Sequence, residues 1–349
     1  MIDILIPNYN GRHLLAPCLD SILPQLGTDD LVTVIDNGSR DGSVELLREK
    51  YPRVNLVLHA GNQGFSAAVN AGIVATRQPL VFLLNNDTEL AGDCLARLTE
   101  AVTRHPGYDF FALKMLDYRR RTVLDGAGDG YFRGGMGYRL GTMEEDGPEY
   151  DQQVRVFGAC AGAAVYRRSF FEKVGLFDED FFAYLEDVDL NLRAMRRGMR
   201  CLFLPRARVY HIGSATSGST FNPLTIKLTT RNSFRVLVKN YPVSLFVTLL
   251  PVITIYQLSW LLFVIKKGQL PAYFAGIVSF VKNSRRTLGK RQASLRDPVV
   301  TGGEFLELIT KAERDVVRSI MRRRRAAGKG NGLLKLYGRL FLRRVRDHE

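Results

Sequence analysis

The first ninety residues repeat one pattern four times: a mostly apolar run without strict polar–apolar alternation, a polar turn, and then a helix-like segment. The runs are Ile2 to Ile6, Leu31 to Ile35, the VNLVL of residues 54–58, and Leu80 to Leu84. Strands with one face in water alternate polar and apolar residues, whereas continuous apolar runs indicate strands buried on both faces. The repeat therefore predicts an α/β fold with a mostly parallel, Rossmann-like sheet and helices on both faces.

The rest of the first 222 residues is less regular. Residues 115–157 are polar and Gly-rich, which predicts short strands and a loop, and residues 200–213 predict a pair of strands. The predicted helices cover residues 12–26, 43–50, 65–77, 168–174 and 186–197.

Polar side chains follow the ends of the predicted strands. Asn8, Asp36, Asn62 and Asp87 each come just after an apolar run. In a parallel sheet the loops at the carboxyl ends of the strands form the ligand crevice. We therefore expect these four side chains to gather along one edge of the sheet.

The run LLNNDTEL ends in Asn85, Asn86 and Asp87. A metal ion that holds a diphosphate needs only one or two protein carboxylates, and Asp87 can serve as one of them. The neighbouring amides can bond phosphate, ribose or sugar hydroxyls without adding repulsive charge. The alternative is that these residues only turn the chain and cap a helix.

Three carboxylates, Glu186, Asp187 and Asp189, stand at the start of a predicted helix. A carboxylate near a helix N-terminus stays ionised at neutral pH, as a general base must. The alternative is that the acids only pair with the positive end of the helix dipole.

His211 ends the predicted strand pair. A neutral imidazole is a good ligand for a divalent metal that already holds Asp87. A purely structural histidine is the alternative.

The excess positive charge lies entirely in the last quarter of the chain. Residues 266–349 contain 21 Lys and Arg against 7 Asp and Glu, whereas residues 1–265 contain 28 of each. The basic residues are interleaved with Leu, Val and Phe, which favours an anionic membrane surface over a nucleic acid as the partner. We therefore expect membrane binding and no nucleic-acid binding.

An uncharged stretch precedes this tail. Residues 241–265 carry no charge over 25 residues, which is long enough for a membrane span. Pro251 interrupts the stretch, and a single span would export the basic tail against the positive-inside tendency. We favour helices that lie in or dip into one leaflet, with a span as the alternative. The predicted division is a catalytic domain (1–222), an apolar helical region (223–285) and a basic helical tail (286–349).

The cysteines indicate a reducing compartment. Cys18, Cys94, Cys160 and Cys201 are scattered and form no CxxC pair, so neither a zinc cluster nor a disulfide framework is expected. Met1 leads directly into a strand pattern without the basic start of a signal peptide. The expected location is the cytoplasmic face of the inner (plasma) membrane.

Six motifs together resemble those of family 2 glycosyltransferases, and most of all bacterial rhamnosyltransferase-type members that build surface polysaccharides. The motifs are ILIPNYNG, VIDNGSRDGS, GNQGFSAAVNAGI, LLNNDTEL, GLFDEDFFAYLEDVDLNLRAMRRG and VYHIGSAT, and they occur in the family's order across residues 1–240. The resemblance implies a GT-A fold and an inverting transfer from a nucleotide-activated sugar. It also implies that the RNSFRVLVKNYP stretch and the apolar segment after it associate with a membrane.

The resemblance also implies roles for single residues. Asp87 matches the last Asp of the family's metal-binding Asp-x-Asp, whose first Asp is replaced here by Asn85. Asp187 matches the base in the family's Glu-Asp motif, beside Glu186, and His211 matches a histidine that completes the metal site in some relatives. The residues expected to bind the nucleotide are Pro7, Asn8, Tyr9, Asp36, Asn62, Gly64 and, from the amide argument above, Asn86.

The expected reaction moves rhamnose or a hexose from a nucleotide-diphosphate donor to a lipid-linked or polysaccharide acceptor, assisted by Mg²⁺ or Mn²⁺. Deoxythymidine-diphosphate rhamnose is the first expected donor, and uridine-diphosphate hexoses come next. One alternative is a sugar-phosphate nucleotidyltransferase, which usually has a Gly-rich basic loop after its first strand, where this chain has PNYNGRH. Another is a non-catalytic, membrane-bound glycan-binding scaffold, in which Asp87 and Asp187 would be caps only.

Overall fold

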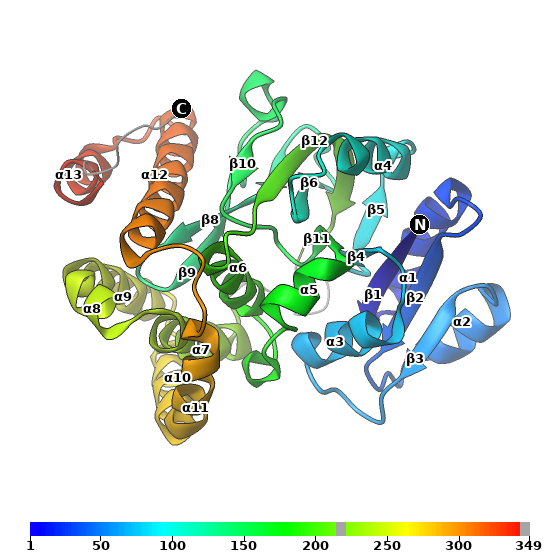
Figure 1. Ribbon diagram of the computed structural model, residues 1–349, viewed down its shortest axis with the longest axis horizontal. Helices are drawn as coiled ribbons and strands as arrows, with labels where there is room; N and C mark the ends of the chain where they lie inside the picture. The colour runs from blue at the N-terminus through cyan, green and yellow to red at the C-terminus, as the bar shows by residue number, and fades with distance from the viewer. Residues whose placement is uncertain (214–220, 343–349) are drawn as a thin grey trace.

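The computed structural model describes residues 1–213 and 221–342, and its centre is a ten-stranded sheet (Figure 1). Across the sheet the strands lie in the order β10 (Arg155–Val156), β12 (Cys201–His211), β6 (Phe110–Asp117), β11 (Ala163–Arg167), β4 (Leu80–Leu84), β1 (Ile2–Asn8), β2 (Leu31–Asp36) and β3 (Asn55–Leu58). The remaining strands are β5 (Thr88–Leu90) beside β12, β7 (Leu124–Ala127) beside β6, and the separate hairpin of β8 (Asp129–Phe132) and β9 (Met136–Arg139). The end of the VYHIGSAT motif, 214–216, and the end of the predicted tail, 343–349, lie outside the described residues.

The strands predicted from the apolar runs pair in parallel. β1 lies between β4 and β2, and β3 follows β2. Asn8 is in register with Asp36, which sets the polar ends of β1 and β2 side by side. The later sheet is mixed, because β11 runs antiparallel to β4 and β6 whereas β12 is parallel to β6. The parallel arrangement thus holds for the first four strands and only partly beyond them.

Helices cover both faces of the sheet. Successive strand residues point to opposite faces, so Ile4 and Phe82 lie in one core while Leu5 and Leu83 lie in the other. The first core is closed by α1 (Arg12–Ile22), α2 (Ser43–Lys50) and α4 (Cys94–Arg104). The second is closed by α3 (Phe65–Ala75), α5 (Arg168–Val174) and α6 (Glu186–Arg196).

Two predicted elements differ in detail. The helix predicted over 12–26 ends at Ile22, and a short 3₁₀ turn with Pro24 follows, because proline fits the first turn of a new helix. The strand pair predicted over 200–213 is instead the single strand β12. The pairing of β12 with β6 is irregular between Leu204 and Arg208, around Pro205, and then resumes.

Seven helices follow residue 221 in the described chain: α7 (Pro223–Asn240), α8 (Val243–Thr248), α9 (Leu250–Lys266), α10 (Leu270–Lys282), α11 (Ser284–Leu295), α12 (Gly302–Ala326) and α13 (Gly332–Phe341). A third core joins α7, α8, α9 and α12 to the sheet domain. In it, Tyr131 and Val188 pack with Val236 of α7, Ile253 of α9 and Phe305 of α12. The three predicted regions therefore share a core, and the proposed boundaries between them stay predictions.

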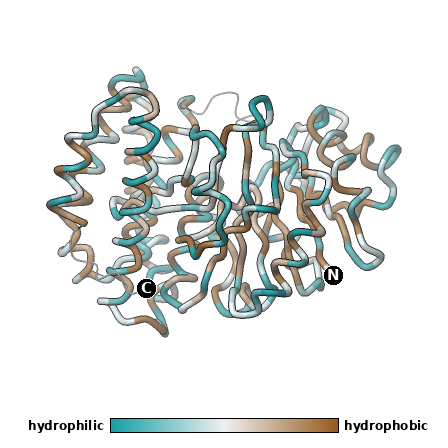
Figure 2. The backbone as a smooth tube through the Cα atoms, turned by 90° about the horizontal axis from the view of Figure 1, so that it is seen from above, coloured by the Kyte–Doolittle hydropathy of each residue, from teal (hydrophilic) through white to brown (hydrophobic). Residues whose placement is uncertain are grey.

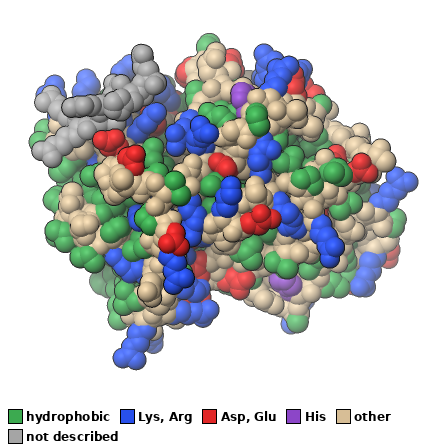
Figure 3. All heavy atoms as spheres, viewed as in Figure 1, with side chains coloured by type: hydrophobic (Ala, Val, Ile, Leu, Met, Phe, Trp, Pro, Cys, Tyr) green, Lys and Arg blue, Asp and Glu red, His purple; other side chains and the backbone are tan. Residues whose placement is uncertain are grey.

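Apolar segments run through the central strands and also through the helices at the end opposite the N-terminus (Figure 2). Within residues 1–213 and 221–342, no helix combines the length and hydropathy that crossing a membrane requires. Many apolar side chains of α8, α9 and α10 nevertheless face outward (Figure 3). This α8–α10 apolar face consists of Val243, Val247, Leu250, Ile255, Leu258, Leu262, Ile265, Leu270, Phe274, Val278 and Val281.

Candidate active site

The ends of β1, β2 and β4 are joined by buried side chains. Asn8 Nδ2 donates to Asp36 Oδ1 at 2.9 Å, and Asn86 Nδ2 donates to Asn8 Oδ1 at 2.7 Å. Gly11 makes this approach possible, since a Cβ there would lie 2.2 Å from Asn86 Nδ2. Three of the predicted nucleotide-binding residues thus form one hydrogen-bonded row. Tyr9, the residue after Asn8, has 37% of its surface exposed and is accessible to a ligand.

A buried residue that the sequence analysis did not single out, Asn37, joins the loops after β2 and β3. Its Nδ2 donates to Asn62 Oδ1 and to the Gly64 carbonyl, both at 3.1 Å, and its Oδ1 accepts from Gln63 N at 3.1 Å. Asn62 Oδ1 in turn accepts from Gly64 N at 2.9 Å. In the sequence, this role could have been suspected because Asn37 directly follows Asp36, a predicted nucleotide-binding residue.

His211 lies between two carboxylates. Its Nε2 is 3.3 Å from Asp87 Oδ1, and its Nδ1 is 2.7 Å from Asp125 Oδ2. The sheet brings these residues together, because His211 of β12 is in register with Thr88 of β5. Burial alone would lower the pKa of His211, but the hydrogen bonds and charges of the two carboxylates raise it to about 9. The protonated ring therefore carries positive charge between the two carboxylates, and a metal ion bound to Nε2 would replace the proton there.

The Asp87–His211 pair is chemically suited to a divalent ion. Carboxylate oxygen and imidazole nitrogen are ligands for such ions, and a carboxylate such as Asp125 on the far ring nitrogen is the usual partner of a metal-bound histidine. In the part of the chain that the structure describes, no group of three or more His, Cys, Asp or Glu side chains is arranged to hold a metal. The pair fits an ion that takes its other ligands from elsewhere.

The predicted base stands at the start of α6. Asp187 Oδ1 accepts from Val188 N at 2.8 Å and Oδ2 from Ala161 N at 3.4 Å. Burial raises the pKa of Asp187, although these N–H groups lower it. Its ionised state at neutral pH stays a prediction. Burial and the charge of Asp187 also raise the pKa of Glu186 to about 8. Glu186 Oε2 finds no hydrogen-bond partner among the described residues.

Asp189, the third acid of this group, has a structural role. Its Oδ2 is 2.9 Å from Arg193 Nε and 2.8 Å from Lys239 Nζ, and its Oδ1 accepts from Asn240 Nδ2 at 2.9 Å. Its side chain is fully buried in these contacts. Asp189 thus has a structural role through these ion pairs, and not through the helix dipole alone.

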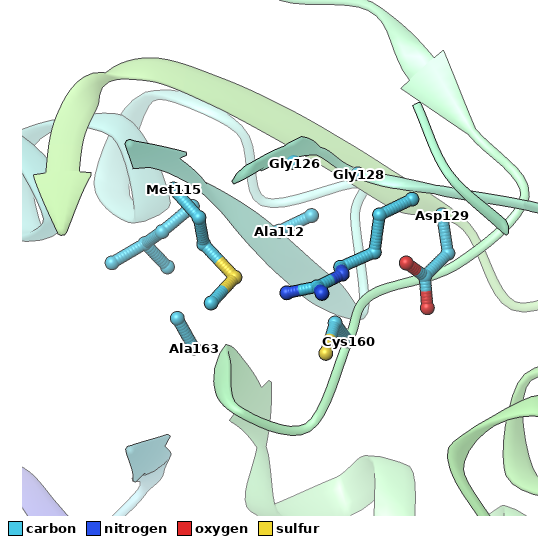
Figure 4. Close-up of a pocket in the computed structure, with 9 residues that line it drawn as sticks. Ala112, Met115, Gly126, Gly128, Asp129, Cys160 and Ala163 are labelled. Atoms are coloured by element: carbon cyan, nitrogen blue, oxygen red, sulfur yellow. The ribbon is translucent and has the colours of Figure 1, made fainter. Parts of the chain in front are cut away.

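Arg139 connects the histidine side of the crevice with the base. Its guanidinium pairs with Asp125, and the charges of Asp129 and Asp187 also act on it. Burial and the charge of Asp187 raise the pKa of Asp129 well above its usual range. Asp129 and Cys160 line a small cavity (Figure 4) with about 10 Å³ of room for the centre of a water-sized molecule. That space fits a single water, so a ligand as large as a nucleotide cannot bind inside this cavity.

Comparison with known proteins identifies a family and a fold. The sequence model described as "Glycosyl transferase family 2" matches residues 3–175. An N-acetylglucosaminyl-diphospho-decaprenol L-rhamnosyltransferase of Mycobacterium tuberculosis is 30% identical over 251 residues, which cover 62% of this chain and 79% of the relative. EpsJ of Bacillus subtilis, an uncharacterised glycosyltransferase, is 27% identical over 220 residues, 58% of either chain.

Two solved structures share the fold. The crystal structure of GalNAc-T7 with UDP, GalNAc and Mn²⁺ matches with a TM-score of 0.55 at 17% identity, over 68% of this chain and 48% of that one. Residues 1–349 of S. aureus TarS match with a TM-score of 0.50 at 16% identity, over 98% of this chain and 87% of that one. At these identities the likeness concerns the fold.

Proposed function

This chain belongs to glycosyltransferase family 2 and has the GT-A fold, and from that premise we propose that it transfers rhamnose or a hexose, with inversion, to a lipid-linked or polysaccharide acceptor. The observation that carries the proposal is a series of interacting charges: His211 lies between Asp87 and Asp125, Asp125 pairs with Arg139, and the charge of Asp187 acts on Arg139. A transferase needs its base and its diphosphate-binding group close together, since the donor's diphosphate leaves as the acceptor attacks.

Nucleotide-diphosphate rhamnose is the donor that we propose first. The relative from M. tuberculosis is named as an L-rhamnosyltransferase, and the GalNAc-T7 structure holds UDP. The row of Asp36, Asn8 and Asn86 would contact the nucleoside, because Asp36 and the amides keep lone pairs or N–H groups beyond those used in the row. Pro7 and Tyr9 would flank the base, and Asn62 and Gly64 would border the pocket.

Asp87 and His211 would hold a Mg²⁺ or Mn²⁺ ion, with Asp125 orienting the imidazole ring. The bound ion would offset the negative charge on the leaving diphosphate. Mn²⁺ accompanies UDP in the GalNAc-T7 structure, which supports a divalent ion here.

In this proposal Asp187 accepts the proton of the acceptor hydroxyl. That oxygen bonds to the anomeric carbon as the bond to the diphosphate breaks on the opposite face, which inverts the configuration. Burial raises the pKa of Asp187, and a carboxylate of higher pKa is the stronger base while it is ionised. Glu186, with a pKa raised to about 8 by burial, holds its proton near neutral pH and adds no second negative charge beside the base.

We place the enzyme at the cytoplasmic face of the membrane, bound peripherally through the α8–α10 apolar face. Exposed Lys266, Lys267 and Lys282 lie at the ends of α9 and α10, where they can reach anionic headgroups while the apolar side chains enter the leaflet. The acceptor of the M. tuberculosis relative is linked to decaprenol, a lipid, which supports such a location. No observation in the described part of the chain favours the nucleotidyltransferase or scaffold alternatives.

A donor screen tests the proposed function. The purified full chain is incubated with deoxythymidine-diphosphate rhamnose or uridine-diphosphate hexoses, with and without Mn²⁺, and with N-acetylglucosaminyl-diphospho-polyprenol as acceptor. We expect rhamnose transfer that needs both the metal and the acceptor and stops on chelation. Transfer from a hexose donor alone would move the donor assignment to the second candidate. Absence of transfer from every donor would contradict the proposal.

A further inference from the structure

The backbone just before α6 has an uncommon conformation. Phe182, Tyr184 and Leu185 have positive φ values of 66°, 69° and 65°. Residues with side chains avoid this region, and such a conformation persists only where the surroundings enforce it. Leu185 directly precedes Glu186 and Asp187, so this loop sets the position from which the proposed base projects.

One side chain holds three carbonyls of this loop. Asn232 Nδ2 lies 3.0 Å from the Phe181 oxygen, 2.9 Å from that of Ala183 and 2.7 Å from that of Tyr184. Asn232 is fully buried. Its Oδ1 accepts from Arg231 Nε at 2.9 Å, which leaves the amide N–H groups turned toward the loop.

Other side chains of α7 bind the same segment on either side of these carbonyls. Arg235 donates to the Asp180 carbonyl, before the loop. Lys239 Nζ lies 2.7 Å from Asp178 and 2.8 Å from Asp189, which flank the loop and the base in sequence. Residues of α7 therefore bind this segment from Asp178 to Asp189, and Asn232 binds the part with the positive φ values.

We propose that Asn232 is a positioning residue for the transfer reaction. Its two amide N–H groups, shared among the three carbonyls, fix the first turn of α6 and with it the direction of the Asp187 carboxylate toward the acceptor hydroxyl. This inference rests on the proposed role of Asp187 as the base. It gives the polar face of α7 a part in catalysis, in a stretch whose sequence resemblance suggested only membrane association.

The donor side of the loop has a contact of its own. The Phe182 carbonyl accepts from Ser66 N at 3.3 Å, next to Gly64 at the start of α3. This contact leaves the nucleotide side anchored when Asn232 is removed. Loss of Asn232 should therefore lower turnover more than donor binding.

The test combines Asn232→Ala with Asp187→Asn in the full chain. The control is Ser233→Ala, which removes the neighbouring buried hydroxyl that accepts from Gln257 on α9, 3.0 Å away. We expect Asn232→Ala to lower kcat by about 10- to 100-fold, because a misplacement of about 1 Å can have that effect. The KM for the donor should change less than about 3-fold, and the control should keep kcat within about 2-fold.

The double variant separates positioning from general destabilisation. If Asn232 acts through Asp187, Asn232→Ala has no further effect on the residual transfer of Asp187→Asn. An equal loss in both backgrounds, or a normal kcat for Asn232→Ala, would overturn the inference. Full activity of Asp187→Asn alone would instead remove the proposed base. Should Asn232→Ala not fold, Asn232→Ser enters the same cycle, and failure of both to fold would assign Asn232 to stability and overturn the proposal.

Discussion

At the scale of single residues, two backbone N–H groups, from Val188 and Ala161, hold one oxygen each of the Asp187 carboxylate. We expect Asp187→Asn to lower kcat by about 10²- to 10⁴-fold, the usual contribution of a general base, with little change in nucleotide affinity. Steady-state transfer and calorimetric titration of the nucleotide measure the two quantities. Asp93→Asn, an exposed acid just before α4, is the matched control, and a kcat near that of the unsubstituted enzyme would exclude Asp187 as the base.

Asn37 is the residue whose loss should act on the donor. Its amide joins Asn62 and Gly64, so Asn37→Ala should loosen the nucleotide pocket and raise the KM for the donor by about 10-fold, the equivalent of one lost hydrogen bond of about 1.4 kcal/mol. The value of kcat should fall much less, because Asn37 does not hold the base. The exposed Asn55 of β3 supplies the control variant Asn55→Ala. A change confined to kcat would contradict this role.

At the scale of elements, the ion pairs of Asp178 with Lys239 of α7 and Lys290 of α11 predict that the stability of the fold depends on pH. Burial would raise the pKa of Asp178, but Lys239 and Lys290 lower it below its usual value. A carboxyl whose pKa falls on folding stabilises the native state above its unfolded pKa of about 4. That contribution is lost as the pH falls from there through the lower native pKa.

We therefore expect Asp178→Asn to reduce the free energy of unfolding by about 1–3 kcal/mol at pH 7, because the buried Lys239 loses one of its two carboxylate partners and keeps only Asp189. The difference from the unsubstituted protein should shrink below about pH 4. Urea unfolding followed by circular dichroism at pH 7 and pH 3 measures it. Asp20→Asn, at an exposed acid, should change little at either pH, and a deficit that stays constant with pH would contradict the assignment.

Single elements also show which features could be predicted from the sequence and which could not. Leu80 to Leu84 identified a buried strand because the apolar run is only five residues long, which is short for a helix, and polar residues follow it directly. Asp125 could not be identified, since its meeting with His211 depends on strand register between distant segments and its own surroundings have no periodic pattern. The role of Asn232 could not be identified either. The stretch around it was interpreted as membrane-associating from a family resemblance, and its partners are backbone carbonyls about fifty positions away.

At the scale of the whole molecule, the α8–α10 apolar face predicts binding to anionic vesicles. We expect the protein to sediment with vesicles that contain phosphatidylglycerol, and less so at high salt, because lysine–headgroup attraction is screened. Leu258→Ser with Leu262→Ser should weaken binding by at least about 10-fold, since each leucine loses about 1.5–3 kcal/mol of burial in the leaflet. Leu58→Ser with Val74→Ser, at exposed positions of the sheet domain, is the control. Equal sedimentation of all three proteins would contradict the proposed face.

α7 is one continuous helix that makes polar contacts along two of its sides. Along one side it holds the loop before the proposed base, and along another its Thr230 and Ser233 accept hydrogen bonds from Trp260 and Gln257 of α9. If the α8–α10 apolar face binds a bilayer as proposed, α7 would act as a spacer that sets the height above the lipid at which an acceptor hydroxyl reaches Asp187. Sugars at that height would be elongated, and those further out on a growing glycan would pass beyond reach, so the helix would measure the length of its product.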